Sequence, residues 1–378
     1  EQGEDIDRFL VITFTNAAAA ELRERIAAAI HARLAQRPGD RALRRCATLV
    51  YKAPICTIDA FCLDFLRQWG HLVELDPDFR VCDKAEGEEL RQRALEEVLE
   101  ARYAGIETDA PFAALVDAMA GERDDQMLEK VVLDVHRRVQ AQADPMGWLT
   151  GRQEDYALAP GAVPEDTPWG RVLLADGAQL VQSWAAAMTA VRRDVAWDEL
   201  LEKNYGPSLD ATIEGLERLS QALERGWDEA ADCFPVPFPR PGMKRGEYNE
   251  LLKARMAARR DQCREQMKKL GERFDIGAEQ AMEDLRAVGP AMTALLEVTA
   301  EFDAAFARLK RRRRLIDFAD AEHLTARLLT QPDGAPTALA RDAGARFREI
   351  MVDEYQDTNA VQNAIFRALS SGDNLFMV

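Results

Sequence analysis

Two adjacent carboxylates follow a short apolar run near the end of the chain. Residues 350–352 precede Asp353 and Glu354, and Gln356 comes shortly after them. Such a run predicts a buried strand, and residues that follow a strand lie at the carboxyl edge of a parallel sheet, where α/β proteins bind ligands. In nucleotide hydrolases the first carboxylate holds Mg²⁺ and the second acts as a general base toward water. A bare Asp-Glu pair also occurs as a helix cap, so the pair alone leaves both interpretations open.

A second polar segment follows a predicted strand at the start of the chain. Residues 9–12 form a short apolar, β-branched run, and Thr13, Phe14, Thr15 and Asn16 come directly after it. Thr15 or Asn16 is the natural N-cap of the Ala- and Glu-rich helix expected next. Phe14 has two interpretations with equal support: a platform on which a nucleic-acid base stacks without sequence reading, or a core residue at the end of a strand.

Short strands and helices alternate at both ends of the chain, and these elements would position the polar segments. The predicted strands are residues 9–12, 54–58, 349–352 and 374–378, and the predicted helices are residues 17–35, 61–69 and 360–369. Alternation at this spacing is typical of a parallel α/β sheet. Helical patterns dominate residues 83–348, with Pro- and Gly-rich loops at 144–170 and an extended connector at 234–242. We therefore expect an α/β fold whose parallel sheet is interrupted by a large, mainly α-helical insertion.

Four segments resemble motifs of the superfamily-1 DNA helicases of the UvrD/Rep/RecB kind. Residues 353–358, Asp-Glu-Tyr-Gln-Asp-Thr, resemble the second Walker motif, and this full pattern is far more specific than the carboxylate pair alone. Residues 13–22 resemble motif Ia, and residues 57–62 resemble the next DNA-contacting motif, although the family usually has His where Asp59 stands. Residues 315–324 resemble the segment that re-enters the first motor domain after the helical insertion.

The resemblance implies a role for each motif residue. In the intact protein Asp353 would hold the Mg²⁺ ion of bound ATP, Glu354 would activate the attacking water, and Gln356 would link the nucleotide site to the DNA-binding elements. The residues implied in nucleic-acid contact are Thr13, Phe14, Thr15, Asn16, Thr57 and Phe61. An acid is a poor phosphate contact, so we expect Asp59 to face a backbone amide instead.

The resemblance also implies a domain organisation built on the P-loop NTPase (RecA-like) fold. Residues 1–75 would form the first part of motor domain 1A, residues 76–314 a helical insertion of the 1B kind, and residues 315–378 the return to domain 1A with its Walker B carboxylates. The phosphate-binding loop G-x-x-x-x-G-K-[ST] occurs nowhere in the sequence, and in this family it precedes motif Ia. We therefore expect that loop upstream of Glu1, and we expect this chain by itself neither to bind ATP tightly nor to hydrolyse it.

The implied parent protein is an ATP-dependent helicase that steps 3′ to 5′ along single-stranded DNA. The size of the insertion favours the AddA branch of the family, whose members are helicase–nucleases. That branch implies double-strand break repair and recombination, contact with duplex as well as single-stranded DNA, and an AddB-like partner. Two alternatives stay open: a plain UvrD-type repair helicase without a nuclease, and a non-catalytic module that binds DNA or a protein partner.

Composition narrows the remaining possibilities. The net charge of −17 argues against nucleic-acid binding by the whole surface but leaves room for local basic stretches at 243–273 and 308–314. Each stretch is either a phosphate contact or a solvated helix face, and an apolar stripe of Phe302, Phe306 and Leu309 accompanies the second. Six cysteines without a C-x-x-C pair predict reduced thiols and no zinc or iron–sulfur site. No apolar run is long enough to cross a membrane, so we expect a cytoplasmic protein without a membrane partner.

Overall fold

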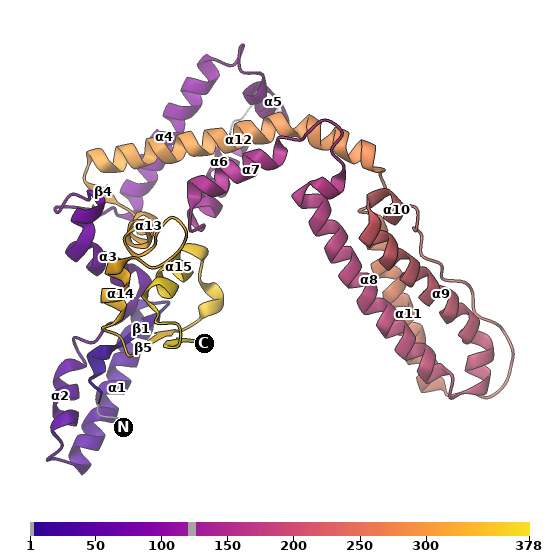
Figure 1. The fold of residues 1–378 in the computed structure, drawn as a ribbon, viewed down its shortest axis with the longest axis horizontal. Helices are drawn as coiled ribbons and strands as arrows, with labels where there is room; N and C mark the ends of the chain where they lie inside the picture. Colours follow the sequence, from indigo (N-terminus) through magenta and orange to yellow (C-terminus); the bar gives the residue numbers. More distant parts are fainter. Residues whose placement is uncertain (1–3, 120–125) are drawn as a thin grey trace. The chain divides into compact units, whose positions relative to one another are not determined.

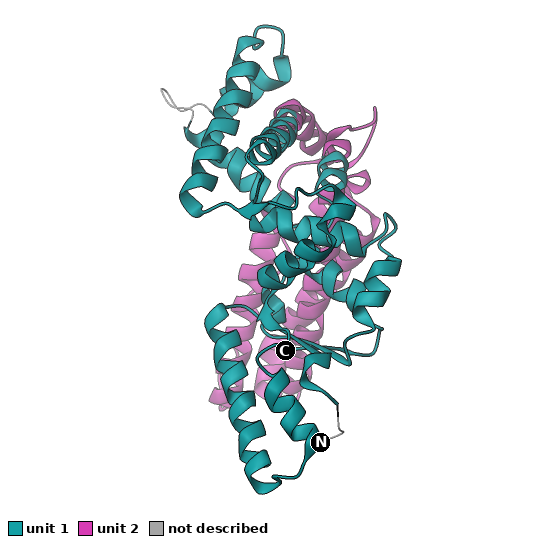
Figure 2. Ribbon diagram, turned by 90° about the vertical axis from the view of Figure 1, so that its left-hand side faces the viewer, with its two compact units in different colours: residues 1–152, 294–378 teal, residues 153–293 magenta. Residues whose placement is uncertain are grey.

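The computed structural model of the chain describes residues 4–119 and 126–378. These residues fall into two compact units (Figure 2). Unit 1 comprises residues 1–152 and 294–378, and unit 2 comprises residues 153–293.

Unit 1 contains a four-stranded parallel sheet in the order β2-β1-β5-β6 (Figure 1). Its strands are β1 (Phe9–Thr13), β2 (Ile55–Thr57), β5 (Glu349–Val352) and β6 (Leu375–Met377). All four were predicted from their short apolar runs, and these predictions are confirmed. Thr13 pairs with Thr57, and Ile12 pairs with Val352. This register brings the carboxyl ends of β1, β2 and β5 to one edge of the sheet.

Alternate side chains of β1 enter two different cores. Leu10 and Ile12 pack in the larger core, and Val11 packs in a smaller one. Because successive side chains of a strand point to opposite faces, helices cover the sheet on both sides. The covering helices are α1 (Asn16–Gln36) at the smaller core, and α3 (Ile58–Trp69), α13 (Phe318–Leu329) and α15 (Ala360–Leu369) at the larger core. Burial on both faces explains why the strands are apolar throughout instead of alternating with polar residues.

Polar residues at the carboxyl edge of the sheet start the helices that leave it. Thr15 caps α1 by accepting a hydrogen bond from the Ala18 amide (3.1 Å). Thr57 caps α3 in the same way, by accepting one from the Ala60 amide (3.3 Å). Of the two predicted caps for α1, Thr15 is therefore the one used, because Asn16 is already the first helical residue.

The remainder of unit 1 is mainly helical. Its further elements are α2 (Arg41–Leu49), α4 (Lys84–Ala104), α5 (Ala110–Met119), α6 (Gln126–Gln140), most of α7 (Pro145–Tyr156), the second half of α12 (Ala278–Arg312), α14 (Ala338–Gly344) and a short parallel pair, β3 (Arg80–Val81) with β4 (Leu315–Ile316). The limits of unit 1 differ from the boundaries suggested by the sequence, which fall after residues 75 and 314. The division into motor domain and insertion stays a prediction.

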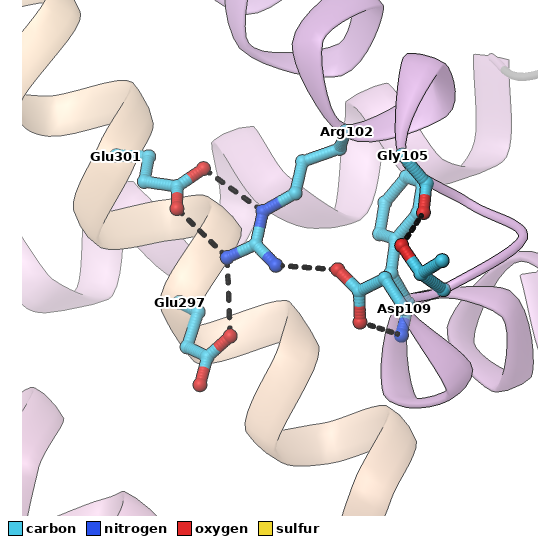
Figure 3. Close-up of polar contacts among 7 residues, drawn as sticks. Arg102, Gly105, Asp109, Glu297 and Glu301 are labelled. Atoms are coloured by element: carbon cyan, nitrogen blue, oxygen red, sulfur yellow. Dashed lines mark hydrogen bonds and ion pairs between the residues drawn. The ribbon is translucent and has the colours of Figure 1, made fainter.

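Arg102 on α4 connects three helices of this region (Figure 3). Its guanidinium donates to both oxygens of Glu301 (3.0 and 2.8 Å) and to Glu297 (3.1 Å) on α12, and to Asp109 (2.7 Å) just before α5. The hydrogen bonds from Glu301, then those from Asp109 and Glu297, raise the pKa of Arg102 well above its usual value despite partial burial. A permanently charged side chain thus ties α4 to α12.

Helix α7 corrects one prediction. The sequence indicated Pro- and Gly-rich loops over residues 144–170, but α7 occupies most of the first half of that range. Pro145 is its first residue, where the missing N–H of proline costs nothing, and Asp144 accepts a hydrogen bond from the Gly147 amide (3.0 Å). Proline here starts a helix instead of ending one.

Unit 2 is a helical bundle built around one apolar core. Its helices are α8 (Pro168–Val195), α9 (Glu199–Arg225), α10 (Trp227–Ala231), α11 (Glu250–Gly271) and the first half of α12. Val181, Met188, Leu216 and Cys263 are fully buried between α8, α9 and α11. This core explains why α8, α9 and α11 form long helices, since each has an apolar face to bury.

An extended connector precedes α11, as predicted from its prolines. Three polar residues spaced four apart on α9 hold it: Thr212 donates to the Pro237 carbonyl (2.9 Å), Ser208 to the Pro239 carbonyl (2.7 Å), and Asn204 to the Lys244 carbonyl (3.0 Å). The connector therefore extends past residue 243, where the helical pattern was expected to begin. Helix α11 begins only at Glu250, after its cap Asn249.

Three further features concern membranes and metals. None of the helices in the described part of the chain has both the length and the apolar character to cross a membrane. All six cysteines are free thiols, as predicted. Within residues 4–119 and 126–378, no group of three or more His, Cys, Asp or Glu side chains is arranged to hold a metal ion.

Candidate functional site

The carboxyl ends of β1, β2 and β5 enclose a small pocket of about 100 Å³. The side chains that line it come from segments more than 300 residues apart, and the parallel register brings them together. The polar and aromatic members of its lining are Thr13, Phe14, Thr57, Asp59, Asp353, Thr358, Gln362 and Phe366. Three of the four motif-like segments identified in the sequence therefore meet at one place.

The carboxylate pair lies at the mouth of this edge. Asp353 is exposed, and its backbone amide donates to the Ile12 carbonyl (3.0 Å), which attaches the end of β5 to β1. Glu354 is also exposed and has a φ of 53°, in the left-handed region that residues other than glycine seldom adopt. Non-glycine residues in such conformations cluster at functional sites. The Gln356 side chain donates a hydrogen bond to the Glu354 carboxylate, although neither residue lines the pocket.

The segment after β1 forms the second wall of the pocket. Thr13 is only 3% exposed, and its hydroxyl donates to the Thr15 carbonyl (3.1 Å), which shapes the turn into α1. Phe14 is 58% exposed and lines the pocket. The interpretation of Phe14 as a core residue is therefore wrong. Thr15 and Asn16 are exposed at the start of α1, and the Thr15 hydroxyl is used as the helix cap.

The segment after β2 contributes unequally. Thr57 is largely buried and caps α3, and Asp59 in the first turn of α3 lines the pocket. Burial raises the pKa of the Asp59 carboxyl above its ordinary value. Phe61 does not line the pocket: it is half-buried against the larger core, with its ring stacked 6.0 Å from the ring of Phe65. Contact between Phe61 and nucleic acid stays a prediction.

Comparison with known proteins agrees with this arrangement. The family model of the UvrD/REP helicase N-terminal domain matches residues 1–378. The chain belongs to this family. Membership and the parallel sheet together confirm the predicted fold class, an α/β sheet interrupted by helices.

Curated relatives of this UvrD/Rep family chain share one name, that of the AddA component of an ATP-dependent helicase/nuclease. The relative from Heliobacterium modesticaldum is 35% identical over 407 residues, which cover 100% of this chain and 29% of the relative. Those from Desulforudis audaxviator and Pelotomaculum thermopropionicum are each 37% identical, covering 99% of this chain and 31% and 30% of the relatives. The chain thus spans less than a third of the length of these proteins.

Two residues of this family site were not identified from the sequence. Gln362 lines the pocket from α15, and Glu322 on α13 lies behind it, only 6% exposed. Gln362 occupies the third position of a capping box with Asn359, a spacing that could have been recognised. Glu322 gives no such signal, because nothing in its neighbourhood along the chain indicates that a charged side chain is buried there.

The basic stretch at the end of α12 contacts acidic residues of unit 1. Arg308 pairs with Glu97 (2.6 Å), Arg313 with Glu89 (3.2 Å), and Arg314 with Asp76 (3.0 Å). The apolar stripe predicted beside this stretch is confirmed, since its members are buried: Phe302, Phe306 and Leu309. These pairs favour the interpretation of the stretch as part of the folded unit over that of a phosphate contact.

Proposed function

We propose that this chain forms part of the motor of an ATP-dependent DNA helicase of the AddA helicase/nuclease kind. The observation that carries the proposal is the meeting of Thr13, Phe14, Thr57 and Asp353 around one pocket at the carboxyl edge of a parallel sheet. In α/β proteins that edge is where nucleotides and other ligands bind. A pocket bordered by a carboxylate pair on one side and an exposed aromatic on the other suits a site where ATP hydrolysis and DNA contact are coupled.

The carboxylate pair suits Mg²⁺ chemistry. Carboxylate oxygens are the hard ligands that Mg²⁺ prefers, and it usually takes one or two of them together with phosphate oxygens. The exposed Asp353, fixed through its backbone to β1, meets that requirement. When bound, Mg²⁺ neutralises charge on the phosphates. In our proposal Glu354 accepts the proton of the attacking water, and the hydrogen bond from Gln356 holds the Glu354 carboxylate in position and links it to the DNA-binding elements.

The turn after β1 is the proposed DNA track. Phe14 offers an exposed ring on which a base can stack without sequence reading, and Thr15, Asn16 and Thr57 offer polar groups for the backbone. Phe61 completes the set as a support beneath the track. Sequence-independent contact of this kind permits stepping along single-stranded DNA, in the 3′ to 5′ direction by family resemblance.

Residues 1–378 do not contain a phosphate-binding loop, since the sequence lacks G-x-x-x-x-G-K-[ST]. We therefore expect the 378-residue chain alone neither to bind ATP tightly nor to hydrolyse it. The whole protein would act in double-strand break repair and recombination in the cytoplasm, on single-stranded and duplex DNA, with an AddB-like partner. Two rivals are a plain UvrD-type repair helicase, which would lack nuclease activity, and a non-catalytic binding module, which the missing loop favours.

Binding of a fluorescent single-stranded oligonucleotide, measured across a salt series, tests the proposal. Phe14→Ala should weaken binding by about 1–3 kcal/mol, because one stacked base is lost. Salt should weaken binding of both proteins, because phosphate contacts release counterions. Tyr51→Ala is the matched control, an equally exposed aromatic of unit 1 outside the pocket, and should bind as the unmodified chain does. Equal affinity of the Phe14→Ala and Tyr51→Ala variants would refute the proposed track.

A further inference from the structure

Glu322 is a carboxylate buried directly behind the pocket. It lies in the first half of α13 and is only 6% exposed. Its Oε1 accepts a hydrogen bond from Nε2 of Gln362 (2.6 Å), and its Oε2 accepts one from Nδ2 of Asn359 (3.3 Å). One donor on each oxygen fixes the orientation of the carboxylate and uses it fully as an acceptor.

Gln362 connects this carboxylate to the pocket. It lines the pocket together with Asp353 and Thr358. Its Oε1 accepts a hydrogen bond from the Asn359 backbone amide (3.4 Å), and its own backbone amide donates to the Asn359 side chain (2.8 Å). The side chain of Gln362 is therefore held at both ends, by the helix cap on one side and by Glu322 on the other.

The same contacts determine where the loop that carries the carboxylate pair ends. This loop, residues 353–359, begins at β5, where the Asp353 amide donates to the Ile12 carbonyl (3.0 Å). It ends at the cap of α15, Asn359, whose side chain donates to Glu322. One end of the loop is thus attached to the sheet, and the other is attached to α13 through Glu322.

Helix α13 is itself supported on the side away from the pocket. Nε2 of His323, the neighbour of Glu322, donates to the Gln140 carbonyl at the end of α6 (2.9 Å). The Ala360 amide at the start of α15 donates to the Ala141 carbonyl (3.1 Å). The end of α6 therefore supports both helices, so that Glu322 is presented to Gln362 from a fixed position.

Burial of Glu322 has a cost that packing alone does not explain. Burial raises the pKa of its carboxyl, and the hydrogen bonds from Gln362 and Asn359 counteract that rise only in part, while the charge of Asp59 adds to it. An uncharged side chain would fill the same space without this cost. Buried carboxylates with perturbed pKa values gather at functional sites, where their geometry is needed.

We propose that Glu322 is a positioning residue of the pocket: it holds Gln362 against the pocket and the cap of α15 in place, and so sets the loop that carries Asp353 and Glu354. This inference deepens the proposed function and rests on it for the identity of the ligands. It requires two carboxylate acceptors at position 322 facing two amide donors.

A reciprocal exchange of the two side chains tests this inference. Glu322→Gln turns one acceptor into a donor, so that one amide at positions 359 or 362 loses its partner. Gln362→Glu places two buried carboxylates against each other. The double variant, Glu322→Gln with Gln362→Glu, restores a donor–acceptor match at every contact, with the direction of one hydrogen bond reversed. Glu100→Gln, on the exposed face of α4, controls for the loss of one charge.

Two measurements on the full chain separate positioning from folding. Hydrogen–deuterium exchange of the amides at 360–363 should be about tenfold faster in each single variant, because a buried partner is lost, and should return to the original rate in the double variant. Binding of the fluorescent oligonucleotide should follow the same order: weaker in both single variants and restored in the double variant. Glu100→Gln should change neither quantity, and the Glu322→Gln variant should keep its thermal unfolding midpoint.

The outcomes distinguish this inference from the proposed function. Unchanged exchange in the single variants, or no recovery in the double variant, overturns the positioning role. Faster exchange with unchanged oligonucleotide binding overturns its connection to the site. If the unmodified chain does not bind the oligonucleotide at low salt, the proposed DNA track fails, whereas rescue of exchange in the double variant still supports Glu322 as the residue that positions Gln362.

Discussion

The chain has two basic stretches of similar composition, and they differ in what their charges contact. At the end of α12, carboxylates of unit 1 pair with most of the stretch, and Lys310 is only 4% exposed between Asp317 (3.0 Å) and Asp320 (2.6 Å). On α11 of unit 2 the basic residues are mostly exposed. Among the described residues, Arg264 is the one on that helix that forms an ion pair, with Asp261 (3.3 Å).

The difference shows that a run of basic residues does not by itself indicate a phosphate contact. The acidic residues of α4 and of the loop before β3 are distant in sequence from the end of α12, yet the fold places them beside it. Where the fold supplies carboxylates, basic residues become part of the folded unit. Where it does not, as over much of α11, they stay available to solvent or to a partner.

Loss of the Lys310 charge should produce the largest effect on stability. Burial alone would lower the pKa of Lys310, but Asp320 and Asp317 outweigh burial and keep it raised, so the ammonium is charged in the folded protein. Lys310→Met leaves two buried carboxylates without their cation, and the free energy of unfolding should fall by about 3–5 kcal/mol. Urea denaturation measures this change. Arg311→Met, on the exposed face of the same helix turn, should change it by less than about 0.5 kcal/mol.

His323 sharpens the comparison, because it is a buried basic side chain whose burial is not outweighed by carboxylates. Burial lowers its pKa from 6.5, and the hydrogen bond with Gln140 and the charge of Asp303 offset this only in part. A group with a depressed pKa in the folded state contributes stability above its unfolded pKa and loses it as pH falls through the folded value. The unmodified chain should therefore lose stability below pH 6.5.

Urea denaturation of His323→Gln across the same pH range checks this expectation. The variant can still donate to the Gln140 carbonyl but cannot be protonated, so its stability should fall less steeply below pH 6.5. His31→Gln, an exposed histidine on α1, should follow the unmodified chain. Parallel pH curves for the His323→Gln variant and the unmodified chain would contradict the assignment.

The smallest effect on stability is expected on α11. Lys268 and Lys269 are exposed, so replacing both with Ala should change the free energy of unfolding by less than about 0.5 kcal/mol. The same variant decides between the two interpretations of the stretch. If both lysines contact phosphates, the slope of log affinity for duplex DNA against log salt should decrease by about 2. An unchanged slope would identify a solvated helix face.

Local patterns in the sequence predicted the elements at the sheet well. The strand at residues 349–352 and the helix at 360–369 have the bounds expected from their apolar runs. Such elements are readable because burial on both faces of a parallel sheet selects continuous β-branched and apolar residues, and because helix caps act over three or four residues. Predictions failed where proline had a different role, at α7, and where distant residues extended the connector before α11.

The sequence by itself determined which residue types follow each strand: Thr and Phe after β1, Thr and Asp after β2, and the carboxylate pair after β5. The parallel register then makes their convergence at one edge a geometric necessity. Only the tertiary structure decided that Phe14 is exposed and Phe61 packed, that Lys310 is buried between two carboxylates, and that Glu322 lies behind Gln362. Each of these depends on contacts between helices far apart in the chain. Burial and pairing of a charged side chain are properties of its neighbours in space, and no local pattern of residues encodes them.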